Sequence, residues 1–226
     1  MSPEVHAMLV DKGIDPEAAL KLASHIGQFE SENVPTAVQR LPSGGEGEGK
    51  GLYQYEAGSA QSAYNRATNP KSLDSLKSYL DPIDYADALG WMEKLKENEF
   101  DVVKARLTAQ QQTDLFILDQ LRAKNNFKAT VKNISKSPTT NDLANLTFTY
   151  WAKYHKRKFN PVKANGKTVK TAEQVRAEAE SRWMQLAALN TKKLKKPLMS
   201  QEQAVFAMNK GGYRYKAESK VAELLG

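Results

Sequence analysis

Helix-start signals divide this chain into segments, and they constrain its fold more than any other feature of the sequence. In each signal the side chain of a short polar residue can accept a hydrogen bond from the first turn of a helix. In one kind Pro follows this residue, and in the other a Gln three residues later can bond to the backbone N–H of the capping residue. The signals are Asp15 with Pro16, Thr108 with Gln111, and Thr171 with Gln174. We therefore predict helices over 16–31, 108–124 and 171–190.

Apolar residues at helical spacing support this division and add further helices. Leu22, Ile26 and Phe29 lie on one stripe of the first helix, as expected for a face that packs on the core. The last helix has a similar stripe formed by Val175, Ala179, Trp183 and Leu186. We also predict helices near 71–79, over 85–97 and after Pro138, which places the chain in the mainly α class.

A glycine-rich segment interrupts the helical pattern between Leu41 and Gly51. Glycine occupies positions 44, 45, 47, 49 and 51, and such a segment is too flexible for a helix. We interpret it as a loop that enters a short β-hairpin carrying Leu52, Tyr53, Gln54 and Tyr55. Its letters G-x-x-x-x-G-K do not predict a phosphate-binding loop, because Gly51 follows the lysine and two glutamates would repel phosphate.

Composition limits the domain organisation and the chemistry. With 226 residues, 40% of them hydrophobic, the chain can form one main domain, which we place at 1–190, and 191–226 reads as a basic linker and a short helical element. There is no cysteine, and the three histidines are scattered. We therefore expect no metal and no cofactor. Residues 1–10 lack the apolar core of a signal peptide, and no stretch reaches the roughly 20 apolar residues of a membrane span.

Basic residues are concentrated between Lys153 and Lys170, which we interpret as a surface loop. The whole chain has a net charge of +7 and a pI of about 9.3. Such a chain is attracted to polyanions, which include nucleic acid, an anionic envelope and the bacterial wall. Charge alone does not choose among these partners, and an ordinary solvated loop fits the same pattern.

Two carboxylates occur at the end of the first helix, in the segment from Gly27 to Asn33. Cleavage of a glycosidic bond needs a proton donor at the leaving oxygen, and a carboxyl group shielded from water can stay protonated near neutral pH. Glu30 and Glu32 are two residues apart, so at about 100° per residue they point roughly 160° apart around a helix. Only one of them can face a given cleft.

The chain resembles the phage tail lysozyme family from about Ala18 to Leu189. That family has a helix with G-N-x-x-x-E-S, matched here by Gly27-Gln28-Phe29-Glu30-Ser31-Glu32-Asn33, and a hairpin with G-L-x-Q-W, matched by Gly51-Leu52-Tyr53-Gln54-Tyr55. Its S-Y-E-R-P helix end is similar to Tyr150–Arg157, and its final helix is similar to Arg176–Trp183. Residues 81–107 look like an insertion, and Asn33 and Tyr55 replace the family's usual serine and tryptophan.

The resemblance implies a lysozyme-like fold and a peptidoglycan-cleaving enzyme, either a muramidase or a lytic transglycosylase. The glutamate of the family motif falls on Glu32, which is the expected catalytic acid, and Glu30 falls on a non-catalytic position. Tyr53, Gln54, Tyr55 and Tyr154 are the expected substrate-binding residues. Glu46 and Glu48 are the nearest candidates for a second carboxylate.

The resemblance also implies a place of action and partners. A protein of this kind is made in the host cytoplasm, is carried in the virion as a tail or internal protein, and opens the bacterial cell wall for genome entry. Its partners would be peptidoglycan and other phage structural proteins, with nonspecific contact to nucleic acid or an anionic envelope. Two alternatives stay open: a cytoplasmic endolysin, and a non-catalytic virion or DNA-ejection protein that keeps a lysozyme fold.

Overall fold

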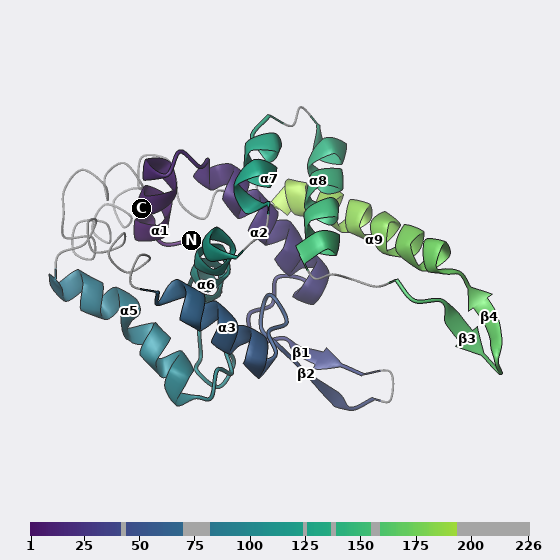
Figure 1. Ribbon diagram of the computed structural model, residues 1–226, viewed down its shortest axis with the longest axis horizontal. Helices are drawn as coiled ribbons and strands as arrows, with labels where there is room; N and C mark the ends of the chain where they lie inside the picture. Colours follow the sequence, from purple (N-terminus) through teal and green to yellow (C-terminus); the bar gives the residue numbers. More distant parts are fainter. Residues whose placement is uncertain (42–43, 70–81, 124–125, 137–138, 155–158, 194–226) are drawn as a thin grey trace.

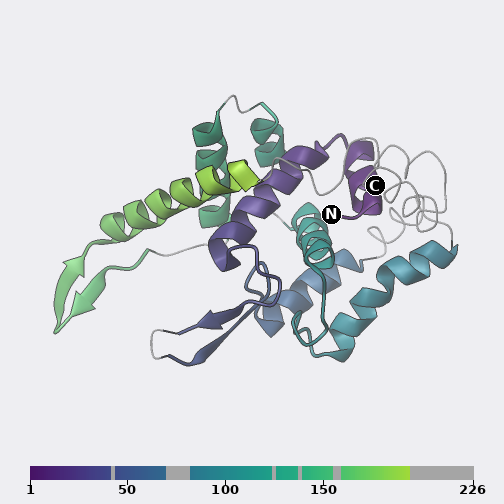
Figure 2. The ribbon, with the colours of Figure 1, turned by 180° about the vertical axis from the view of Figure 1, so that it is seen from behind.

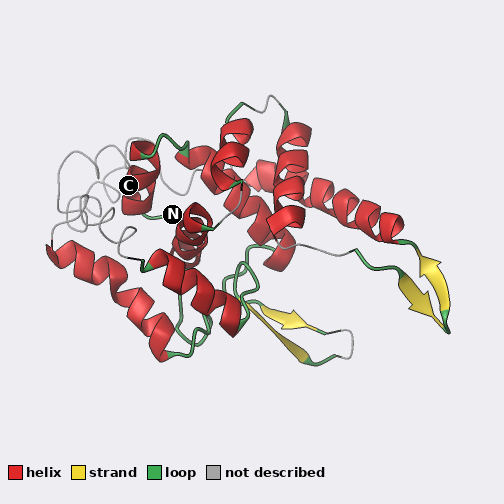
Figure 3. Cartoon of the chain, in the orientation of Figure 1, coloured by secondary structure: helices red, strands yellow, loops and turns green. Residues whose placement is uncertain are grey.

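The computed structural model is dominated by helices, which confirms the predicted mainly α class (Figure 3). It describes residues 1–226 except 42–43, 70–81, 124–125, 137–138, 155–158 and 194–226. Within the described residues there are eight helices and two sheets, each of two antiparallel strands. No helix in this part of the chain is both long and apolar enough to cross a membrane.

The elements follow one another along the chain with short connections. The helices are α1 (Pro3–Asp11), α2 (Pro16–Ser31), α3 (Ala57–Ala67), α5 (Pro82–Glu97), α6 (Ala109–Arg122), α7 (Phe127–Ile134), α8 (Thr140–Tyr154) and α9 (Ala172–Lys193). The strands are β1 (Val38–Arg40), β2 (Glu46–Lys50), β3 (Val162–Ala164) and β4 (Lys167–Lys170). Helices α1, α3 and α7 were not predicted, and the helix predicted near 71–79 lies outside the described residues.

Helices α2 and α6 form the centre of the molecule. Helix α2 packs against α7, α8 and α9 on one side, whereas α6 packs against α3 and α1, and α2 and α6 contact each other. Figure 1 shows these two groups of helices on either side of that central pair. The buried hydrophobic side chains form one cluster that runs through both groups.

The helix-start signals act as predicted. The Asp15 side chain accepts hydrogen bonds from the backbone N–H groups of Glu17 and Ala18, at 2.9 and 3.1 Å. Both capping boxes also form, each with reciprocal bonds between the Thr and the Gln. Helix α9 continues to Lys193, so the first residues of the predicted linker are helical. The remainder of the predicted 191–226 element lies outside the described residues.

The predicted hairpin is placed wrongly. The strands are Val38–Arg40 and Glu46–Lys50, whereas 51–54 is a turn and Tyr55 forms a single antiparallel bridge with Lys50. The glycines are part of strand β2 because other side chains cross it: a Cβ on Gly47 would come within 2.3 Å of the Gln39 Oε1 atom. Glycine inside a strand often marks such a close approach, and here that outweighs its flexibility.

The basic stretch also contains a second hairpin that was predicted as a loop. Strands β3 and β4 pair antiparallel, with Val162 opposite Lys170 and Ala164 opposite Lys167. Asn165 and Gly166 form the turn, both with positive φ, which is the backbone state that a tight two-residue hairpin turn requires. The Asn-Gly pair was therefore the signal in the sequence for this hairpin.

Candidate functional site

Glu32 lies immediately after the last residue of α2, where the helix stops. Its φ is 56° and that of Asn33 is 61°, so two successive residues adopt the left-handed conformation. The backbone N–H of Glu32 donates to the Gln28 carbonyl and that of Asn33 to the Gly27 carbonyl, each at 3.1 Å. These bonds close the helix end and leave the Glu32 side chain exposed to solvent.

The end of α2 is joined to the turn at 51–54 through Ser31. The Ser31 hydroxyl contacts two carbonyl oxygens, that of Gly27 at 3.0 Å and that of Leu52 at 2.9 Å. The Asn33 side chain folds back over the same turn of helix, so a Cβ on Gly27 would lie 2.6 Å from the Asn33 Oδ1 atom. A larger residue at position 27 would displace the Asn33 side chain. The two resembling motifs are in direct contact here through Ser31 and Leu52.

Gln112 of α6 fixes the segments that follow Glu32. Its side-chain oxygen accepts a hydrogen bond from the Leu52 N–H at 2.8 Å, and its nitrogen donates to the carbonyls of Pro35 and Leu107, both at 2.9 Å. Gly51, with φ of 72°, packs so closely that a Cβ would come within 2.3 Å of the Gln112 Oε1 atom. Sequence reasoning missed Gln112, although its place on the same helix stripe as Leu115 and Leu118 predicts a buried polar residue with structural bonds.

The other two resembling segments also meet the last turns of α2. The Trp151 indole N–H donates to a Glu30 carboxylate oxygen at 2.6 Å. The Phe29 ring centroid lies 4.7 Å from that of Trp151 and 4.8 Å from that of Trp183. The guanidinium of Arg182 lies over the Phe29 ring at 5.5 Å. Glu30 and Glu32 therefore have different surroundings, as their helical phase predicted.

The buried hydroxyl of Thr147 contacts this aromatic cluster and joins it to His25. The Thr147 hydroxyl accepts from the Trp183 indole N–H at 2.9 Å and lies 3.3 Å from the His25 Nδ1 atom. Burial and, to a smaller extent, the nearby charge of Lys21 together lower the pKa of His25 to about 4. His25 is therefore neutral at physiological pH, and it links α2 to α8 as a structural residue.

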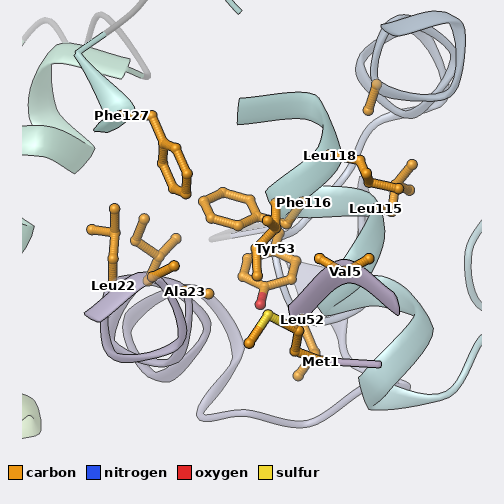
Figure 4. Close-up of a cluster of buried hydrophobic side chains, with 14 of the residues drawn as sticks. Met1, Val5, Leu22, Ala23, Leu52, Tyr53, Leu115, Phe116, Leu118 and Phe127 are labelled. Carbon is orange, nitrogen blue, oxygen red and sulfur yellow. The ribbon is translucent and has the colours of Figure 1, made fainter. Parts of the chain in front are cut away.

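Two of the three tyrosines expected to bind substrate, Tyr53 and Tyr55, are core residues. Tyr53 stacks on Phe116 with ring centroids 4.4 Å apart, and its hydroxyl lies 3.2 Å from the Thr113 hydroxyl (Figure 4). Burial raises the pKa of Tyr53 well above its usual range. Tyr55 is only 7% exposed and its ring packs edge-on against Tyr53. The sequence predicted that both lie on a hairpin strand, but Tyr53 occupies a turn and Tyr55 a single bridge.

The remaining candidates are distributed around the first hairpin. Gln54 has a φ of 49°, and its side-chain nitrogen donates to the Gly51 carbonyl at 2.8 Å, so it stabilises the turn. Glu46 lies between Arg40 and Lys50 at 3.8 and 3.9 Å. Glu48 is exposed on the same strand. Tyr154 is the last residue of α8, and the direction of its side chain lies outside what the structure describes.

A small pocket lies between α1 and α6, lined by Met8, Lys12, Leu118, Leu121 and Arg122. None of its lining residues belongs to the segments 27–33 or 51–55 around Glu32. No group of three or more His, Asp or Glu residues that could hold a metal ion occurs among the residues that the structure describes.

In comparisons with known proteins, no family model, no curated protein and no solved structure matches this chain. The site therefore stands on its own geometry. It consists of an exposed carboxylate at a left-handed helix end, held against a turn by Ser31 and Gln112 and backed by an aromatic cluster.

Proposed function

We propose that this protein is a peptidoglycan-cleaving glycosidase whose catalytic acid is Glu32. The observation that carries the proposal is the convergence of four segments that are far apart in the sequence. The helix end 27–33 contacts the turn 51–55 through Ser31, the segment 150–157 through Trp151, and the segment 176–183 through Trp183. These are the four segments in which the chain resembles phage tail lysozymes, and contact among them is what a shared site requires.

In the proposed reaction Glu32 gives its proton to the leaving glycosidic oxygen between MurNAc and GlcNAc. Such an acid must be protonated when the bond breaks, which requires that its carboxyl group be removed from water. Glu32 is exposed in the free protein, so the bound glycan strand itself would have to cover it. No cofactor takes part in the proposed chemistry.

The nucleophile distinguishes two versions of this reaction. In a hydrolase a second carboxylate or a positioned water completes the cleavage, and Glu48 fits that role better than Glu46, which is engaged by Arg40 and Lys50. In a lytic transglycosylase the sugar's own hydroxyl attacks, and one carboxyl group is sufficient. The biological role that goes with either reaction is local opening of the cell wall by a virion-carried enzyme, with host lysis by an endolysin as the alternative.

A second candidate function is a virion or DNA-ejection protein that has kept this architecture without catalysis. The exposure of Glu32 and the burial of Tyr53 and Tyr55 favour it, because a glycan strand needs accessible rings to bind and a shielded acid to react. The two candidates differ in a single measurable property, the release of muropeptides.

The deciding experiment compares the full chain with Glu32→Gln on purified peptidoglycan, by turbidity and by chromatography of the released fragments. Loss of the acid should lower the rate at least about 100-fold, the usual contribution of general acid catalysis. Glu30→Gln is the matched control, because the amide keeps an oxygen that can accept from Trp151, and it should stay active. If wild type releases no muropeptides, or if Glu32→Gln is as active as wild type, the enzyme proposal fails.

Mass spectrometry of the same products assigns the reaction. Anhydro-muramic ends identify a lytic transglycosylase, whereas reducing ends identify a hydrolase. In the second case Glu48→Gln should also reduce the rate if Glu48 activates the water.

A further inference from the structure

The second hairpin projects from the molecule as an arm. We define the cationic arm as residues 162–170, which comprise β3, the turn and β4. Both hairpins extend beyond the helices at the same end of the molecule, and the arm reaches furthest from the body (Figures 1 and 2). Its described side chains are all exposed, with Val162 and Val169 at 45% and 55%.

The arm is the charged end of a segment without acidic residues. Between Lys153 and Lys170 the sequence has seven Lys and Arg residues and no Asp or Glu. The formal charge of this segment, +7, equals the net charge of the whole chain. Residues 191–226 are also basic, with a formal charge of +5, and an acidic excess of 5 in the remaining residues balances them. The segment 153–170 is therefore one of two basic segments, and it is the one that contains no acidic residue.

The lysines of the arm differ in their bonding. Lys170 donates to a Glu178 carboxylate oxygen at 2.8 Å, which attaches the base of the arm to α9. Lys163 and Lys167 have no ion pair with any other residue that the structure describes. Their charges are directed to solvent, and they are the two groups that remain to bind a partner.

The strand register places these two free charges on opposite faces. Lys163 pairs with Thr168, and Ala164 pairs with Lys167. Because successive residues of a strand point to opposite faces and paired residues share a face, Lys163 and Lys167 face opposite ways. A charge on each face fits a partner that surrounds the arm, whereas a membrane surface would require the charges on one face.

We propose that the cationic arm inserts into the peptidoglycan network and binds the carboxylates of its peptides. This inference rests on the proposed function, and it names a substrate contact that lies outside the Glu32 site. The network is an open polyanionic mesh that an exposed hairpin can enter, and the charges of the arm complement it. The arm's described residues include no aromatic ring that could stack on bases, so the arm lacks one of the two elements of a single-strand binding surface, and nucleic acid is the less suitable partner.

The test measures binding separately from cleavage, using the full chain with Glu32→Gln and purified sacculi from which other wall polymers have been removed. In this background Lys163→Gln with Lys167→Gln should weaken binding about tenfold at low salt, as expected for two exposed ion pairs. The control pair Lys132→Gln with Lys136→Gln removes the same charge from exposed positions elsewhere and should change binding less than twofold. The difference should shrink as salt is raised.

Three results would overturn the proposal. The arm variant could bind sacculi as tightly as the Glu32→Gln parent. Both pairs could weaken binding equally, which would indicate net charge instead of the arm. The arm variant could lose affinity for duplex DNA and keep its affinity for sacculi, which would assign the arm to nucleic acid. Failure of the catalytic proposal is a separate result, since it appears as absent muropeptide release by protein that still carries Glu32.

Discussion

The two hairpins of this protein are similar in size and opposite in every other respect. The first, β1 with β2, has two acidic and two basic residues between positions 38 and 50, and Arg40 and Lys50 both lie beside Glu46. The turn that follows it is fixed to the helical body by Gln112 and Ser31. The second, the cationic arm, has three lysines and no acid, and the ion pair between Lys170 and Glu178 attaches it to α9.

Under the proposed function, this contrast separates two tasks, the positioning of Glu32 and the binding of the wall polymer. The turn that follows the neutral hairpin belongs to the framework that positions Glu32, and hydrogen bonds of Leu52 to Ser31 and Gln112 hold it to the helical body. The cationic arm is exposed along its length, so the interactions of its lysines are available to a partner and contribute little to the free energy of unfolding. Rigid and adaptable parts are thus assigned to different hairpins, and the following experiments test that assignment.

Gln112→Ala should have the largest effect, because it removes the anchor of the first hairpin. The substitution leaves the Leu52 N–H and the carbonyls of Pro35 and Leu107 without their side-chain partner in the core. At about 1 to 1.5 kcal/mol for each bond, we expect a loss of about 4 kcal/mol in the free energy of unfolding, measured with urea. Gln110→Ala, at an exposed position of the same helix, should change stability by less than about 0.5 kcal/mol.

Gly51→Ala tests the same anchor by adding one methyl group. The new Cβ would meet both Gln112 and the Val102 side chain, at 2.3 and 2.7 Å, and φ at this position is 72°. The matched control is Gly13→Ala, where φ is 63° and nothing lies within 4 Å. We expect about 1 kcal/mol of destabilisation at position 13, from the backbone alone, and about 3 kcal/mol at position 51. Equal losses at both positions would show that the turn is not closely packed on α6.

The stability of the helical body that carries the arm depends on pH through His25. The unfolded chain binds a proton to this group near pH 6.5, whereas the folded protein binds it only near pH 4. The unfolded state therefore holds more protons between these values, and His25 contributes stability that is lost as the pH falls from 6.5 to 4. We expect the loss from pH 7 to pH 5 to be about 2 kcal/mol greater in wild type than in His25→Gln, measured by urea unfolding at both values.

Lys170→Gln should have the smallest effect. Its ion pair with Glu178 joins side chains that are 46% and 58% exposed, so water and salt screen it. We expect a change in stability below about 0.5 kcal/mol, visible as a shift of no more than about 2 °C in Tm. A larger loss would contradict the view that the arm is energetically separate from the fold.

The sequence predicted the parts of this fold that depend on local chemistry. Asp15, Thr108 and Thr171 cap helices because each side chain needs only the next turn of its own helix. The first hairpin was placed wrongly because the strand at Gly47 and Gly49 depends on side chains of Gln39 and Gln54 that cross it. These contacts join residues only five to ten positions apart, but they depend on how the side chains fold across the strand, which the pattern of glycines does not indicate.

The same distinction applies to the candidate site. Helical phase predicted that Glu30 and Glu32 would differ, and the structure places the first against Trp151 and leaves the second exposed. The burial of Tyr53 depends on Phe116 and Thr113, both on a helix more than 50 positions away. The segment Gly51-Leu52-Tyr53-Gln54-Tyr55 was therefore sufficient to indicate a motif. It was insufficient to indicate which of its side chains are accessible. Whether Glu32 is catalytic stays a prediction.

The left-handed backbone at Glu32 has a consequence for how this protein can change over generations. Glycine would adopt that conformation at about 1 kcal/mol less cost than glutamate, and asparagine also tolerates it. If the carboxylate has no function, substitutions to glycine or asparagine at this position would therefore be accepted more readily than retention of glutamate. Among descendants of this chain, the lineages that keep glutamate at position 32 despite its backbone cost would be those in which selection still maintains the carboxylate.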